Sequence, residues 1–162
     1  MYKKAREFAV AAHGEQRYGT QPYAYHLDEV VALLTPYGEQ AMLVGYLHDV
    51  VEDTHVTLDE VATEFGPFVA QCVAILSDEP GENRQQRKAK TYQKMAAVQG
   101  ETTLALIVKT ADRLANVTAC IETNNQRLLA LYQKEQPAFY QAAYRAGLCD
   151  DLWQQLEKQL KT

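Results

Sequence analysis

The stretch YLHDVVEDT, residues 46–54, combines an aliphatic and a charged pattern at helical spacing. At about 100° per residue, Leu47, Val50 and Val51 fall on one side of a helix that we predict over residues 39–53. The titratable side chains of the stretch fall on the other side: His48, Asp49, Glu52 and Asp53. The aliphatic side predicts a helix anchored in a core, so the open question is what the charged side faces.

The charged side of this helix is either a solvated surface or the wall of a cavity. Residues 41–47 are apolar on nearly every side, which is typical of a central, buried helix. Two carboxylates about 6 Å apart repel by roughly 0.7 kcal/mol in water, but by about 3 kcal/mol at an effective dielectric constant of 20. Acids on a cavity wall therefore need a counter-charge, which a divalent cation supplies. Helical geometry by itself leaves both interpretations open.

Length and charge limit the class of protein. The chain has 162 residues and a formal net charge of −5. This length fits one domain and no linker divides it, so we expect a single domain over residues 1–162. An acidic chain lacks the basic face of a general nucleic-acid coat protein, and we expect no nucleic-acid partner. The sequence does not indicate an oligomeric state.

Cysteine content and hydropathy indicate a cytoplasmic protein. Cys72, Cys120 and Cys149 are odd in number and form no C-x-x-C pair, which favours reduced thiols over a disulfide framework or a thiolate zinc site. The apolar run at residues 8–12 is too short for the core of a signal peptide. No stretch approaches the ~18 apolar residues of a membrane span, so we expect no membrane partner.

Helical periodicity dominates the remaining sequence and predicts an all-α fold of seven to nine helices. Besides residues 39–53, helices are predicted over residues 2–13, 26–38, 57–66, 67–77, 87–98, 101–122, 124–147 and 149–160. Thr57 and Glu60 form a capping-box pattern, and Pro67 suits a first helical position. Pro137 should kink or break the helix at 124–147. Residues 14–25 and 78–86 are predicted as loops.

Two residues outside the opening stretch could complete a metal site. His26 starts a predicted helix, where its side chain can point off the helix end. Asp112 belongs to a polar stripe at positions i, i+3, i+4 and i+7: Lys109, Asp112, Arg113 and Asn116. Each has a structural alternative. A histidine at a helix start is often a cap or a surface residue, and Asp112 could simply pair with Lys109 or Arg113.

Three motifs together resemble the hydrolase domain of RelA/SpoT proteins, which are metal-dependent phosphohydrolases of the HD-domain type. They are HGEQRYGTQPYAYH at 13–26, YLHDVVEDTHVTLDEVATEFG at 46–66 and VKTADRLANV at 108–117, in the family's order and at similar spacing. The segment NRQQRKAKTY at 83–92 is similar to the stand-alone members, the small alarmone hydrolases. The resemblance covers residues 5–120 and more weakly the rest. It implies the HD-domain helical fold.

The resemblance also implies a site. It assigns one divalent metal, usually manganese, to four ligands: His26, His48, Asp49 and Asp112. Two imidazoles and two carboxylates suit a borderline ion, but they do not separate Mn²⁺ from Fe²⁺, Co²⁺ or Zn²⁺. Glu52 and Asp53 match the family's catalytic acidic pair. Arg17 matches an arginine that contacts guanine, and Asn116 matches a substrate-contacting asparagine.

The implied reaction is removal of the 3′-pyrophosphate from ppGpp or pppGpp, so the expected partner is a guanine nucleotide substrate. One alternative is a related HD phosphohydrolase acting on a nicotinamide dinucleotide phosphate (NADPH) or a deoxynucleotide. Another is a non-catalytic nucleotide sensor, although a pure binder has no need of Glu52 and Asp53. This sequence departs from the family at Tyr18, where many members carry lysine or arginine.

Some polar residues have no role by resemblance. We expect His13 to be structural and His55 to face solvent. The basic run between 84 and 90 is either a solvated face or an attractor for an anionic substrate. Tyr132, Lys134 and Gln136 fall where the family contacts distal phosphates, and the sequence assigns them no individual roles.

Overall fold

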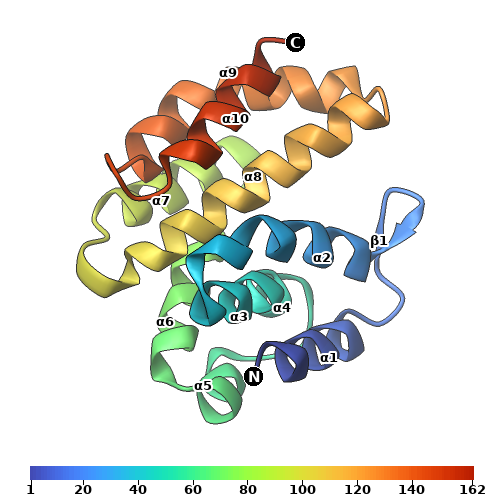
Figure 1. The fold of residues 1–162 in the computed structure, drawn as a ribbon, viewed down its shortest axis with the longest axis vertical. Helices are drawn as coiled ribbons and strands as arrows, with labels where there is room; N and C mark the ends of the chain where they lie inside the picture. Colours follow the sequence, from blue (N-terminus) through green and yellow to red (C-terminus); the bar gives the residue numbers. More distant parts are fainter.

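The computed structural model describes residues 1–162 and contains ten α-helices, two 3₁₀ turns and one short β-hairpin (Figure 1). The helices are α1 Tyr2–His13, α2 Tyr23–Leu34, α3 Glu39–Leu47, α4 Val50–Asp53, α5 Leu58–Phe65, α6 Pro67–Leu76, α7 Arg84–Ala96, α8 Leu104–Glu122, α9 Gln126–Ala143 and α10 Asp150–Leu160. Nine of them are longer than one turn, so the predicted all-α fold with seven to nine helices is confirmed. No helix has both the length and the apolarity needed to cross a membrane.

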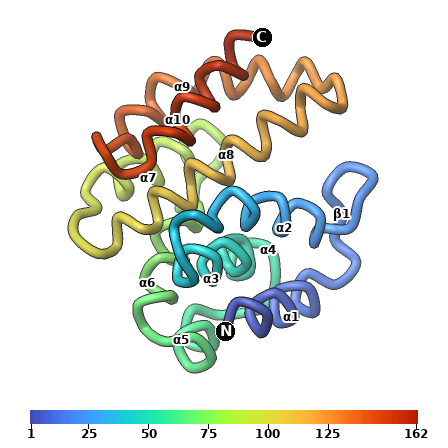
Figure 2. Tube along the Cα trace, in the orientation of Figure 1, coloured from blue at the N-terminus to red at the C-terminus, as the bar shows by residue number.

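Helix α8 runs obliquely through the middle of the molecule (Figures 1 and 2). It packs against α2, α3 and α6 on one side and against α9 and α10 on the other. The 42 buried apolar residues form one cluster, to which helices from α1 to α10 contribute. This continuous core supports the expectation of a single domain over residues 1–162, which stays a prediction. The three cysteines are buried and unpaired, as expected.

The predicted loop over residues 14–25 contains a hairpin and the first turn of a helix. The strands β1 Arg17–Tyr18 and β2 Gln21–Pro22 pair antiparallel, with Gly19 at φ +60° in the turn. Helix α2 starts at Tyr23, three residues earlier than predicted, because the extended Pro22 ends the hairpin directly before it. His26 therefore lies inside the first turn of α2 instead of at its start, and its side chain is buried.

The helix predicted over residues 39–53 is interrupted. Helix α3 ends at Leu47, His48 and Asp49 form a turn, and α4 continues from Val50. Asp49 adopts φ −103° and ψ −2°, at the edge of the right-handed helical region and close to the bridge region common in active sites. On a straight helix, adjacent side chains diverge by about 100°. The turn instead lets the side chains of His48 and Asp49 converge.

Several helix ends follow the predicted signals. Thr57 and Glu60 form the predicted capping box of α5, and Pro67 occupies the first turn of α6. Helix α7 starts at Arg84, three residues earlier than predicted, because the Asn83 side chain accepts a hydrogen bond from the Gln86 backbone N–H at 2.9 Å.

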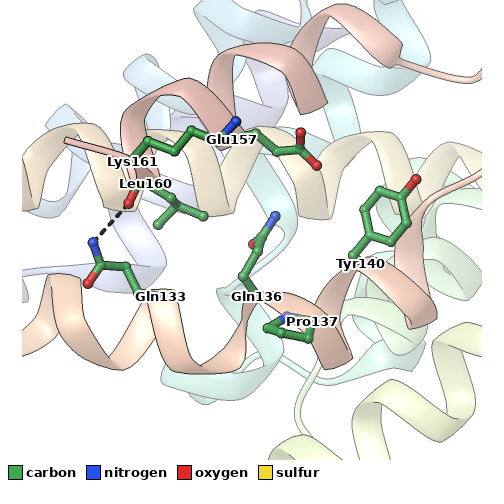
Figure 3. Close-up of a pocket in the computed structure, with 7 residues that line it drawn as sticks. All are labelled: Gln133, Gln136, Pro137, Tyr140, Glu157, Leu160 and Lys161. Atoms are coloured by element: carbon green, nitrogen blue, oxygen red, sulfur yellow. Dashed lines mark hydrogen bonds between the residues drawn. The ribbon is translucent and has the colours of Figure 1, made fainter.

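Helix α9 continues through Pro137, so the predicted break is wrong. Buried side chains on both sides of the proline, Tyr132 and Phe139, hold the two halves of the helix on one core. Helix α10 lies alongside, and Gln133 Nε2 donates to the Leu160 carbonyl at 2.8 Å (Figure 3). Between α9 and α10 lies a groove of about 470 Å³ lined by Gln133, Gln136, Pro137, Tyr140, Glu157, Leu160 and Lys161.

Gly45 allows α2 and α3 to approach closely. A Cβ atom at this position would lie 2.6 Å from Leu34 Cδ1 and 3.1 Å from Val31 Cγ2, and both of these side chains are buried. We expect Gly45→Val to lower the free energy of unfolding by about 3 kcal/mol through overpacking, or roughly 6–12 °C in Tm. Thermal unfolding followed by circular dichroism measures this.

A control for this variant is Ala32→Val, which adds two methyl groups on the exposed side of α2. It should change the stability by no more than about 0.7 kcal/mol. Equal Tm values for the two variants would contradict the role assigned to Gly45.

Candidate metal centre

Four side chains from three parts of the fold converge on one point. His26 comes from α2, His48 and Asp49 from the turn after α3, and Asp112 from α8. One ligand atom from each lies within 4.8 Å of all the others. His48 Nε2 is 3.0 Å from Asp49 Oδ2 and 3.3 Å from Asp112 Oδ1. The structure thus brings together the four residues that the resemblance named.

The protonation pattern of His48 fits a cation at this point. Its Nδ1 lies 2.6 Å from the Gly45 carbonyl oxygen and donates to it, so in the neutral ring Nε2 carries a lone pair. This Nε2 is buried, has no hydrogen-bond partner and faces the carboxylate oxygens of Asp49 and Asp112. Three electron-pair donors facing one another need a positive centre between them. The donor set therefore suits one divalent ion.

Charges around the cluster perturb its titration. Burial by itself would raise the pKa of the Asp112 carboxyl, but His48, His26 and Lys109 hold it well below its usual range. Burial opposes the charged form of His48 as well, yet the two carboxylates raise the pKa of its imidazole. Both carboxylates thus stay ionised, which is the form that binds a metal, and a bound cation would displace the proton that they favour on His48 Nε2.

Tyr23 orients one of the four candidate ligands, Asp49, through a hydrogen bond. Its hydroxyl donates to Asp49 Oδ2 at 2.5 Å, and its ring packs against His13 with 4.5 Å between centroids. Burial, followed by the adjacent Asp49 carboxylate, raises the pKa of the phenol, which keeps its proton. Sequence reasoning missed this contact, because it depends on the packing of α2 against the turn after α3.

Removing the Tyr23 hydroxyl should weaken metal binding without unfolding the chain. We expect Tyr23→Phe to lower Mn²⁺ affinity about 10- to 100-fold, because the partner that orients Asp49 is lost. Calorimetric titration of the metal-free protein measures the change. Tyr37→Phe is the control, since the Tyr37 hydroxyl has no hydrogen-bond partner in the protein. Unchanged affinity in Tyr23→Phe would exclude the supporting role.

The two candidate catalytic acids stand on α4 and are held by different loops. Glu52 Oε1 accepts a hydrogen bond from the Asp78 backbone N–H at 2.7 Å, and Asp53 Oδ2 accepts one from Gln16 Nε2 at 3.1 Å. Desolvation raises the pKa of Glu52 and the Asp78 and Asp49 carboxylates add to this, while the backbone hydrogen bond opposes it. A carboxylate with a raised pKa is closer to what a general base requires.

The two candidate substrate contacts differ in their placement. Asn116 Nδ2 donates to Asp112 Oδ1 at 3.2 Å, and Asn116 Oδ1 accepts from the Tyr18 hydroxyl at 2.5 Å. Tyr18 stacks on His26 with 4.4 Å between ring centroids. Arg17, in contrast, lies on the exposed hairpin, and its one hydrogen bond goes to the Thr20 carbonyl at 3.4 Å. The structure does not bring Arg17 to the cluster.

A cavity of about 340 Å³ adjoins the cluster at Tyr18 and Asn116. Its wall consists of Tyr18, Gly19, Thr20, Gln21, Tyr25, Asn116, Ala119, Cys120, Glu122, Thr123, Asn125, Leu128 and Tyr132. No lining side chain is cationic, and three are tyrosines. Of the three tail residues singled out in the sequence, Tyr132 lines this cavity, whereas Gln136 faces the groove between α9 and α10 (Figure 3).

Cations lie on the side of the site near Glu52. Lys109 is buried on α8 with its Nζ 3.6 Å from Asp112 Oδ2. Lys88, on α7, pairs at 3.0 Å with Asp78, whose backbone N–H holds Glu52. Arg113 points elsewhere: it donates to the Tyr92 hydroxyl at 2.8 Å. Asp112 therefore pairs with Lys109 and also faces the metal site, so the two interpretations of this residue coexist.

The basic run on α7 contacts both α9 and the preceding loop. Arg84 forms a two-point ion pair with Glu135 at 2.8 and 3.2 Å, and Lys90 donates to the Pro80 carbonyl at 2.9 Å. Only Lys88 of this run is linked to the site. His55 is exposed, as expected. His13 is buried and contacts Gln16, a residue to which the sequence gave no role.

Comparison with protein families gives the class of the protein. The sequence matches the HD domain family over residues 5–149, and the chain belongs to that family. A protein of Aquifex aeolicus named guanosine-3′,5′-bis(diphosphate) 3′-pyrophosphohydrolase is 28% identical over 149 residues, which cover 90% of this chain and 21% of that protein. A protein of Brucella ovis named GTP pyrophosphokinase rsh is 29% identical over 164 residues, covering 98% of this chain and 22% of that protein.

The chain therefore spans about a fifth of the length of the curated relatives it matches. Two solved structures share its fold. A protein described as a metazoan orthologue of SpoT that hydrolyses ppGpp superposes with a TM-score of 0.79 at 22% identity, covering 99% of this chain and 93% of that chain. A Listeria monocytogenes protein superposes with a TM-score of 0.66 at 21% identity, covering 83% and 95%. The HD-domain helical fold implied by the resemblance is confirmed.

Proposed function

We propose that this chain hydrolyses the 3′-pyrophosphate of guanosine alarmones, converting ppGpp and water to GDP and pyrophosphate, and pppGpp and water to GTP and pyrophosphate. The observation that carries the proposal is the buried, unpartnered Nε2 of His48 facing two carboxylates, with an acidic pair one turn further on. The name of the Aquifex aeolicus relative favours guanosine alarmones over other nucleotides.

His26, His48, Asp49 and Asp112 would hold one divalent ion, which we propose to be Mn²⁺. When bound, such an ion polarises a phosphate oxygen and lowers the pKa of water. Tyr23 keeps Asp49 in its ligating orientation, and the Gly45 carbonyl fixes the tautomer of His48. The chain thus supplies a rigid set of ligands.

Glu52 is the proposed general base, and Asp53 the residue that orients the attacking water. The raised pKa of Glu52 supports this division, because a stronger base accepts a proton from water more readily. Both carboxylates lie on the single turn α4, directly after the ligand pair. The short helix α4, Val50–Asp53, therefore places both acids close to the proposed ligands His48 and Asp49.

The distribution of charge suggests how the nucleotide lies. The cavity beside Asn116 has aromatic rings and no cation, which suits a base and its ribose. Lys109 and Lys88 lie on the Glu52 side, where they would offset the charge of the pyrophosphate. We propose Asn116 as a substrate contact. We retain Arg17 as a contact with the base that requires the hairpin to move.

Incubation of the Mn²⁺-loaded protein with ppGpp, pppGpp, NADPH and deoxynucleoside triphosphates tests the proposal. We expect release of pyrophosphate from ppGpp, with GDP as the second product on anion-exchange chromatography. If only NADPH or a deoxynucleotide is turned over, the proposed substrate is wrong, but the protein is still a phosphohydrolase. Tight binding of ppGpp without turnover, with each of several metals, would make the protein a sensor and end the enzymatic proposal.

A further inference from the structure

The loop between α1 and β1 places the amide side chain of Gln16 between His13 and Asp53. Gln16 Nε2 is 3.1 Å from Asp53 Oδ2, and Gln16 Oε1 is 2.8 Å from His13 Nδ1. The backbone of Gln16 is held as well: its N–H donates to the His13 carbonyl at 3.0 Å, and its carbonyl accepts from the Tyr23 N–H at 3.1 Å. The Gln16 residue is therefore held by its backbone and by both the nitrogen and the oxygen of its side-chain amide.

The direction of these hydrogen bonds follows from what each group can do. An ionised carboxylate only accepts, so the NH₂ group of Gln16 must face Asp53. The amide oxygen then faces His13, whose Nδ1 must carry the proton and donate. His13 Nε2 is buried without a partner, so the Gln16 amide is the one hydrogen-bond partner of the His13 ring. The hydrogen bond to His13 then holds the Gln16 amide in this orientation.

Asp53 depends on this amide for its orientation. Its side chain is exposed, and Gln16 is the one protein group that hydrogen-bonds to its carboxylate. Only Oδ2 is engaged, which leaves Oδ1 free. The neighbouring Glu52 is held by a backbone N–H, which no substitution at Asp78 except proline removes. The two acids are therefore positioned by independent loops, and one of the two supports is a replaceable side chain.

We infer that Gln16, oriented by His13, is a positioning residue that aims Asp53 at the reacting water. The inference rests on the proposed function, because it assumes that Asp53 takes part in a hydrolytic step. If Gln16 only tethered its loop to α4, its loss would change the stability of the chain and leave turnover intact. A positioning role therefore predicts a lower kcat when Gln16 is replaced, whereas a tethering role predicts an unchanged kcat.

The test compares wild type with Gln16→Leu, which preserves volume but cannot donate. Using the nucleotide that wild type turns over, we expect kcat to fall roughly 10- to 100-fold. KM should stay within about twofold, and the Mn²⁺-dependent rise in Tm should not change. In the Asp53→Asn background, adding Gln16→Leu should change kcat by less than about twofold, because the group that it positions is already disabled.

A second variant and a control make the test independent of folding. Gln16→Glu keeps the length of the side chain but turns an acceptor toward Asp53. Its kcat should recover toward wild type as the pH falls from 8 to 6, because a protonated carboxyl can donate again. Glu15→Gln, at an exposed neighbouring position without a side-chain partner, should keep kcat within about twofold.

The possible outcomes distinguish failure of the proposed function from failure of the role assigned to Gln16. If wild type turns over no nucleotide, the proposed function fails and this inference fails with it. If wild type is active and Gln16→Leu keeps its kcat, only the inference is overturned. Additive losses in Gln16→Leu and Asp53→Asn would also overturn it, because the two residues would then act independently.

Discussion

Replacing Asp112 with asparagine is expected to abolish tight Mn²⁺ binding and to lower kcat/KM for ppGpp at least about a thousandfold. Asp112 Oδ1 lies 3.0 Å from His26 Nε2 and 3.3 Å from His48 Nε2, so one carboxylate oxygen is close to both imidazoles. Asparagine removes the negative charge and supplies at most one neutral oxygen. Losing about 4 kcal/mol of charge stabilisation corresponds to a factor of about a thousand in rate.

Two measurements check this expectation. Wild type at a Mn²⁺ concentration of about 100 times Kd should gain about 2.7 kcal/mol, or roughly 5–10 °C in Tm, and Asp112→Asn should gain nothing. Pyrophosphate release gives kcat/KM for the same samples. The control is Asp59→Asn, an exposed acid on α5 whose carboxylate has no partner. A full Mn²⁺-dependent gain in Asp112→Asn would mean that the four residues are not the metal site.

The second large effect is expected for Glu52→Gln, which should lower kcat about 10²- to 10⁴-fold while leaving metal binding intact. The amide keeps the shape of the side chain but cannot take a proton from water. Glu52 is no ligand, since the four-residue cluster does not include it. Activity and metal affinity should therefore separate in this variant and fall together in Asp112→Asn.

This separation is measured by single-turnover kinetics alongside the Mn²⁺-dependent rise in Tm. Glu29→Gln is the matched control, because Glu29 is exposed on α2 and forms no ion pair. Its kcat should equal that of wild type. If Glu52→Gln kept more than about a tenth of the wild-type kcat, the base would have to be sought elsewhere, with Asp53 as the next residue to replace.

The sequence predicted which residue types meet at the site, but not the local backbone that makes them meet. The motif around His48 and the polar stripe around Asp112 indicated which side chains the site contains and how they are spaced along the chain. The helical projection assumed one straight helix over residues 39–53, and the turn at Asp49 departs from it. A period of about 3.6 residues cannot reveal such a turn, because the residues on both sides of it are helical.

Contacts between distant segments also could not be predicted from the sequence. The Tyr23 hydroxyl reaches Asp49 across 26 positions, and Gln16 reaches Asp53 across 37. Neither pair has a periodic signal, since each depends on how helices and loops pack. Pro137 shows the reverse case: a strong local signal for a break was overridden because the core holds Tyr132 and Phe139 on either side of it.

The wide spacing of the four ligands has a consequence for the lifetime of the chain. His26 and Asp112 are 86 positions apart and lie on different helices, so an ion held between them would act as a removable cross-link. Because the unfolded chain does not hold these ligands together, binding of the ion would stabilise the folded state over the unfolded one. Chelation should then speed amide hydrogen exchange in α2 and α8 and expose the chain to proteases. The amount of this protein in a cell would in that way follow the supply of its metal.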